Sequence, residues 1–75
     1  MTHNEHLGQA DQFIAECKKH IQRQREVLAT AYENGRPTIL PVALLRVLEE
    51  NTRSYEKYRH FILDEIKKAQ AQQQQ

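Results

Sequence analysis

One stretch near the middle of the chain decides the fold: Asn34-Gly35-Arg36-Pro37-Thr38. Asn34-Gly35 supplies a residue for the left-handed conformation in which many helices end. The next two residues do not continue a helix easily, because proline lacks a backbone donor and pushes the residue before it out of the helical region. Thr38 is a favourable helix cap, and Pro41 suits the first turn of a helix. The stretch therefore predicts a tight turn between two helices.

Before this turn, residues 5–34 contain no proline, and their apolar residues recur at alternating spacings of three and four. This spacing is that of one face of an α-helix. Thr2 or Asn4 is expected to cap the helix, and Glu5 is favourably placed at the positive end of the helix dipole. The stripe comprises Leu7, Ala10, Ile14, Cys17, Ile21, Leu28 and Ala31, with polar Gln24 at the one remaining position and Phe13, Val27 and Tyr32 beside it.

A second helical stripe follows the turn, and it is flanked by Leu45, Thr52 and Phe61. Two helices of about 30 residues joined by a short connection are antiparallel neighbours. The sequence therefore predicts an all-α protein, a long antiparallel helical hairpin with helices over about residues 4–34 and 39–70. The stripe of the second helix comprises Leu44, Val47, Leu48, Asn51, Tyr55, Tyr58, Ile62, Ile66 and Ala69.

The position of the turn also predicts which residues lie opposite one another. A turn centred near Pro37 pairs Leu28 with Leu48, Ile21 with Tyr55, Ile14 with Ile62 and Leu7 with Ile66. The same register places Gln24 opposite Asn51. Because a buried amide must be hydrogen-bonded, we expect these two side chains to bond one another or water and to fix the register, as single polar core residues do in coiled coils.

Length and composition indicate a single small domain over residues 1–75. The N-terminus (1–4) and the Gln-rich tail (70–75) are expected to fray. No run approaches the roughly 20 apolar residues of a membrane helix, and the start of the chain lacks the basic and apolar regions of a secretory signal. The lone Cys17 has no intrachain partner for a disulfide, which favours a reducing compartment. We therefore predict a cytoplasmic protein.

The apolar stripes are wider than one seam between two helices requires, and a chain of this size buries only about 60% of its unfolded surface. A four-helix bundle of two hairpins buries the surplus, and twofold homodimers are the commonest soluble assembly. We expect the chain to homodimerise in this way or to pack on another helical protein, whereas a monomer whose first turn or tail folds back is the alternative. The predicted interface comprises Leu7, Phe13, Ile14, Ile21, Gln24, Leu28, Leu44, Leu48, Asn51, Tyr55, Tyr58, Ile62 and Ile66.

Motifs for phosphate loops, dinucleotide binding, hydrolase nucleophiles and zinc proteases are absent from the sequence. Two Glu-His pairs, Glu16 with His20 and Glu56 with His60, contain residues that bind metals. Their spacing of four differs from the spacing of three found in di-metal bundles, and His60 is expected to face solvent. We therefore predict a protein that is not an enzyme, with no catalytic or metal site, no cofactor and no small-molecule substrate.

The charge balance disfavours nucleic acid as a partner, since eleven basic and ten acidic residues give a net charge of only +1. Basic residues do gather in the first helix, at Lys18, Lys19, Arg23 and Arg25, and again at Arg53, Lys57 and Arg59. Glutamates interleave with them, which is typical of a mixed-charge solvated surface. A small RNA-binding dimer that uses the basic residues of the first helix remains the alternative function.

Three runs of sequence resemble a group of short uncharacterised bacterial helical-hairpin proteins with no assigned function. They are Ala10-Asp11-Gln12-Phe13-Ile14-Ala15-Glu16, His20-Ile21-Gln22-Arg23-Gln24-Arg25-Glu26 and Ala43-Leu44-Leu45-Arg46-Val47-Leu48-Glu49-Glu50, within residues 7–66. The resemblance implies a hairpin in a bacterial cytoplasm and transfers no catalytic or binding residue. In architecture alone, the expected hairpin is similar to the dimeric RNA-binding proteins of the Rop type, without a residue-by-residue match.

Overall fold

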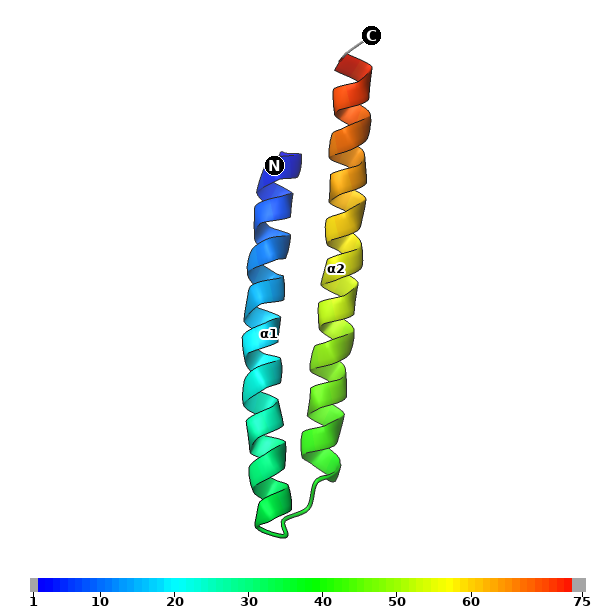
Figure 1. The fold of residues 1–75 in the computed structure, drawn as a ribbon. Coiled ribbons are helices and arrows are strands. Elements are labelled where there is room, and N and C mark those ends of the chain that lie inside the picture. The colour runs from blue at the N-terminus through cyan, green and yellow to red at the C-terminus, as the bar shows by residue number, and fades with distance from the viewer. Residues whose placement is uncertain (1, 74–75) are drawn as a thin grey trace.

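The computed structural model describes residues 2–73, which form two helices: α1 (His3–Glu33) and α2 (Ile39–Gln73). The helices run antiparallel side by side, joined by one short turn (Figure 1). The prediction of an all-α antiparallel hairpin is therefore confirmed, with helix bounds close to those expected. Within the ends that were predicted to fray, α1 begins at His3 and α2 continues to Gln73, whereas Met1, Gln74 and Gln75 lie outside the described residues.

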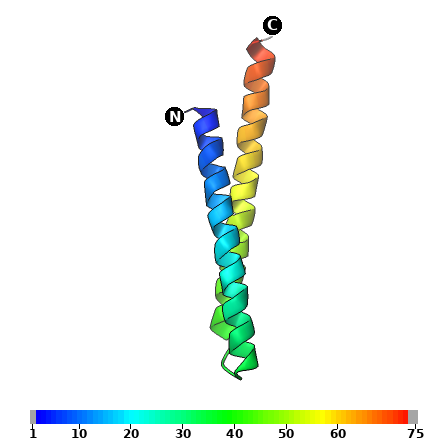
Figure 2. The ribbon, with the colours of Figure 1, turned by 60° about the vertical axis from the view of Figure 1, so that its left-hand side comes forward.

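The hairpin is a rod with principal extents of 64 × 16 × 15 Å. Its radius of gyration is 17.7 Å, whereas a compact domain of this length has a radius of about 11 Å. The two helices cross at a shallow angle along their length (Figure 2). Within residues 2–73 each helix packs against the other helix alone, so each is covered along one side.

The expected caps at the two ends of α1 and the turn are present. The Thr2 hydroxyl accepts a hydrogen bond from the Glu5 amide at 3.1 Å, so Thr2 and not Asn4 caps α1. At the other end Asn34 is the cap, and Gly35 follows in the left-handed region with φ = 65°. The Arg36 amide then donates to the Ala31 carbonyl at 2.8 Å, which closes the turn against the last residues of α1.

The two glycines allow a matched test of the turn. Gly35 needs a positive φ, so Gly35→Ala is expected to destabilise the fold by about 1 kcal/mol. Gly8 lies within α1 with nothing within 4 Å of an added Cβ, so Gly8→Ala is expected to stabilise the fold by about 1 kcal/mol. Thermal unfolding followed by circular dichroism measures both. Equal shifts of the melting temperature in the same direction would contradict this explanation of the turn.

The seam between the helices contains the predicted stripe of α1. Ala10, Ile14 and Ala31 are buried, and Leu7, Cys17, Ile21, Gln24 and Leu28 are half-buried. No large side chain among the described residues is completely buried, and the buried apolar set consists of only four residues. The core is therefore one side chain thick.

On α2 the seam is rotated from the predicted stripe. Leu44, Val47, Asn51 and Tyr58 were expected to face α1, but they are exposed. The seam keeps five residues of the predicted stripe, Leu48, Tyr55, Ile62, Ile66 and Ala69. It adds Pro41, Leu45, Thr52 and Arg59, and the whole set alternates at spacings of four and three. Thr52 is accommodated there because its hydroxyl donates to the Leu48 carbonyl at 2.8 Å, so no polar group is left unsatisfied.

The predicted pairing of Gln24 with Asn51 is wrong. Gln24 Nε2 donates to the carbonyl of Pro41 at 3.1 Å, and Asn51 faces away from the seam. Phe13 stacks on Tyr55 with ring centroids 5.3 Å apart. The register is therefore displaced by roughly two helical turns from the expected one.

The shape of the connection explains this displacement. The chain reverses at Gly35, and residues 36–38 then return alongside the last turns of α1 before α2 begins (Figure 1). Thr38 and Val42 accordingly line one shallow depression together with Leu28 and Tyr32. Because α2 starts level with residues inside α1, its C-terminal end extends past the start of α1 (Figure 1).

Candidate functional site

A second apolar stripe runs along α2 outside the seam. Its side chains are between 43% and 68% exposed, which is unusual for residues of this size in a folded domain. They recur at the same helical spacings as the seam residues, with polar Asn51 and Ser54 in the middle of the series. The stripe consists of Leu40, Leu44, Val47, Tyr58 and Phe61.

α1 contributes to the same side of the hairpin. The Tyr58 hydroxyl lies 3.4 Å from Nδ1 of His6, which places the His6 side of α1 beside the Tyr58 side of α2. Phe13 and Val27 follow His6 at multiples of seven residues, so they share its side of α1, and both are nearly half exposed. Phe13 also covers Tyr55, with an interplanar angle of 24°.

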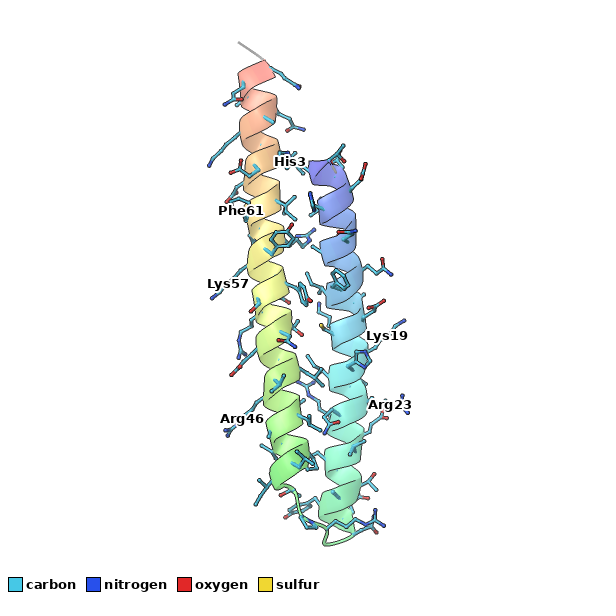
Figure 3. All side chains as sticks on the ribbon, turned by 180° about the vertical axis from the view of Figure 1, so that it is seen from behind. His3, Lys19, Arg23, Arg46, Lys57 and Phe61 are labelled. Carbon is cyan, nitrogen blue, oxygen red and sulfur yellow. The ribbon has the colours of Figure 1, made fainter. Side chains whose placement is uncertain are left out.

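These residues form one surface, which we call the exposed apolar face: Phe13, Val27, Leu40, Leu44, Val47, Tyr58 and Phe61. Exposed polar residues interrupt the series on each helix: His20 on α1, and Asn51 and Ser54 on α2. Phe61 marks the outer border of the face, on the side of α2 remote from α1 (Figure 3). The face thus has an apolar part near the turn and another near the open end of the hairpin.

The opposite side of the hairpin is polar. Arg59 Nε donates to the Asp11 carboxylate at 2.6 Å, and Lys18, Glu56 and His60 line the same shallow depression. The two paired side chains are 39% and 52% exposed, and such surface ion pairs contribute at most about 1 kcal/mol. The hairpin therefore has one charged, solvated side and one apolar side.

The structure divides the predicted interface residues between the seam and the exposed apolar face. Phe13, Leu44 and Tyr58 lie on the face, and Asn51 is one of the exposed polar residues that interrupt it on α2. The remaining nine are at least half-buried between the two helices: Leu7, Ile14, Ile21, Gln24, Leu28, Leu48, Tyr55, Ile62 and Ile66. The seam residues thus hold the hairpin together, whereas the other four are exposed in the single hairpin.

Four residues of the face were not among the predicted interface: Val27, Leu40, Val47 and Phe61. The three on α2 could have been found from the sequence, because Leu40, Leu44, Val47, Tyr58 and Phe61 all fit one series with alternating spacings of four and three residues. The series is interrupted by Asn51 and Ser54, and it lies directly beside the seam stripe, which obscures it.

The two Glu-His pairs do not come together. Glu56 and His60 line the depression next to Asp11, on the charged side. His20 occupies the same helical position as Phe13 and Val27, so it lies on the apolar side. Among residues 2–73, no group of three or more His, Cys, Asp or Glu side chains is arranged to hold a metal ion.

The basic residues of α1 are all exposed. Lys19 and Arg23 point away from α2, on the outer edge of the rod (Figure 3). Lys18, Lys19 and Arg23 line a shallow depression together with Glu26, so an acidic group stands among them. RNA binding by these residues stays a prediction from the sequence.

Neither described helix has a segment both long and apolar enough to cross a membrane. No protein-family model matches the chain, and no curated protein or solved structure is recognisably similar to it.

Proposed function

We propose that this protein is a non-enzymatic protein-interaction module, which buries its exposed apolar face against the helices of a partner. The partner is a second copy of the chain or another helical protein. The observation that supports this function is the face itself: seven large apolar side chains aligned on one side of the rod, each at least 43% exposed. Contiguous apolar surface of this kind marks interaction sites in soluble proteins.

The thin core supports the same proposal. The hairpin has an accessible surface of 6163 Å², whereas a compact monomer of 8.9 kDa exposes about 4,800 Å². The excess, roughly 1,300 Å² per chain, is comparable to one side of an obligate interface, which buries about 2,000–5,000 Å² in total. Assembly would therefore give the chain the core that a single seam does not provide.

Light scattering coupled to size-exclusion chromatography, over a range of concentrations, tests this function. We expect a mass near twice 8.9 kDa. We also expect the mass to persist at high salt, because apolar contacts are not screened by ions in the way that charge pairs are. A monomer at every concentration would contradict self-assembly and leave only a different helical protein as the partner.

A further inference from the structure

We propose that α2 is the helix through which the chain binds a second copy of itself, and that it packs antiparallel on the partner's α2 about a twofold axis beside Asn51. This inference rests on the proposed interaction function, and it names the partner and the helix that receives it. The contact is made by the exposed apolar stripe of α2, which supplies five of the seven side chains of the exposed apolar face: Leu40, Leu44, Val47, Tyr58 and Phe61.

The exposed apolar face is wider on α2 than on α1. On α1 it consists of a single row, Phe13 and Val27, which lie 14 residues apart. On α2 its members alternate at spacings of four and three, so they form two adjacent rows. Leu44 and Tyr58 border the seam and are 46% and 43% exposed, whereas the outer row, which includes Phe61, is 52–68% exposed. A partner must therefore lie against α2 itself to cover both rows.

A second α2 is the helix that matches both rows. If α2 packed on the partner's α1, the outer row of α2 would meet the row of α1 that borders Phe13 away from the seam. That row contains Glu16 and Arg23, both of which are exposed. Burying their charges against apolar side chains would cost free energy. The stripe of α2 has no charged member between residues 40 and 61, since its only polar members are Asn51 and Ser54.

The stripe of α2 is symmetric about Asn51. Leu44 and Tyr58 each lie seven residues from Asn51, which is about 10 Å along the helix. Leu40 and Phe61 lie eleven and ten residues from it. A twofold axis beside Asn51 therefore sets Leu44 against the partner's Tyr58, and Leu40 against the partner's Phe61. This symmetry belongs to one helix, so it does not depend on how α1 and α2 are aligned.

Side-chain size favours the antiparallel direction. The aliphatic members of the stripe lie toward the turn, and the aromatic members, Tyr58 and Phe61, lie toward the open end. An antiparallel pair sets each aromatic ring against an aliphatic side chain, so every such layer has a similar volume. A parallel pair would set each ring against its own copy at one end and Leu40 against its own copy at the other. That contact would be overfilled at one end and underfilled at the other.

The middle of the stripe has the chemistry that a twofold axis requires. A side chain on the axis meets its own copy, and the Asn51 amide both donates and accepts hydrogen bonds, so the two copies can bond one another. A single buried amide pair in an otherwise apolar helix contact also fixes its register. Ser54 meets the partner's Val47 in the adjacent layer, so the polar members are confined to the centre of the contact.

The contacts within the hairpin show where this axis crosses the rod. Arg59 bonds Asp11, and Gln24 bonds the carbonyl of Pro41. Asn51 lies about midway between Arg59 and Pro41 along α2, so it is level with a point about midway between Asp11 and Gln24, in the middle third of α1. The axis thus passes near half-height, and the second copy overlaps the first along most of its 64 Å length. This overlap is long enough to bury the excess accessible surface of the single hairpin.

Disulfide trapping in a Cys17→Ala background tests the arrangement. Asn51→Cys places a thiol and its copy next to the axis, so mild oxidation is expected to join most of the chains into a covalent dimer. Leu44→Cys is the matched control in the same row of α2, because its two thiols would lie about 20 Å apart, beyond the reach of a disulfide. We expect it to crosslink to itself more slowly than Asn51→Cys by a factor of about ten or more.

A mixture of Leu44→Cys and Tyr58→Cys chains tests the direction of packing. The antiparallel pair predicts a crosslink between the two variants, whereas a parallel pair predicts that each variant crosslinks to itself. In a dimeric protein, efficient self-crosslinking of Leu44→Cys would overturn the antiparallel direction, and no crosslinking of Asn51→Cys would overturn the contact between the two copies of α2. A wild-type chain that stays monomeric would instead overturn self-assembly itself, so these failures are distinguishable. Helical circular dichroism of each variant confirms that the hairpin is intact.

Discussion

Replacing Ile62 with Asp is expected to unfold the hairpin. Ile62 is 3% exposed, the lowest value for any large side chain in the seam, and the neighbouring cation on α2, Arg59, is already bonded to Asp11. An unpaired buried carboxylate costs about 3–5 kcal/mol, while a chain of this length has a total stability of about 4–11 kcal/mol. Since the core is one side chain thick, we expect the free energy of unfolding of this protein to lie near the lower limit of that range.

Far-UV circular dichroism and urea denaturation measure this effect. We expect Ile62→Asp to lose most of its helical signal at 25 °C or to unfold at a much lower urea concentration than the wild type. His60→Asp is the control, since it introduces the same side chain two residues away on the exposed surface of α2. An Ile62→Asp variant with the urea midpoint of the wild type would show that the seam is not the core.

The second large effect is expected from Leu44→Asp on the exposed apolar face. Leu44 is 46% exposed in the single hairpin, so a carboxylate there stays hydrated when the chain is monomeric. In the proposed dimer it is desolvated, and by symmetry every dimer contains two such groups. We expect association to weaken by at least about 100-fold, which corresponds to roughly 3 kcal/mol.

Sedimentation or light scattering at micromolar concentration should then report a mass of one chain for Leu44→Asp. The melting temperature should fall as well, because assembly stabilises the fold by mass action. Ala43→Asp is the matched control: Ala43 is the preceding residue, it is exposed, and it lies outside the face. If both variants keep the mass of two chains, the assembly does not use this face.

The sequence was sufficient to predict the hairpin and the buried side of α1. Its turn combines glycine and proline, which stop helices for independent steric reasons. The apolar residues that flank the seam stripe of α1, namely Phe13, Val27 and Tyr32, are isolated and do not form a second continuous stripe at helical spacing. A helical wheel therefore indicates only one side of α1 that can be buried.

The buried side of α2 could not be assigned in the same way. Leu44-Leu45, Val47-Leu48 and Phe61-Ile62 are adjacent apolar pairs, so two stripes about 100° apart both satisfy the helical spacing. Which member of each pair faces α1 depends on the register, and the register depends on where the chain reverses. That point is Gly35, and the return of residues 36–38 along α1 cannot be deduced from turn propensity alone.

The order of contacts along the rod has a consequence for how the hairpin folds. Gln24 and Pro41, near the turn, are 17 residues apart in sequence, whereas His6 and Tyr58, at the open end, are 52 apart. Closing the longer loop first costs about 1 kcal/mol more chain entropy than closing the shorter one. Folding is therefore expected to nucleate at the turn and to proceed along both helices toward the open end of the hairpin.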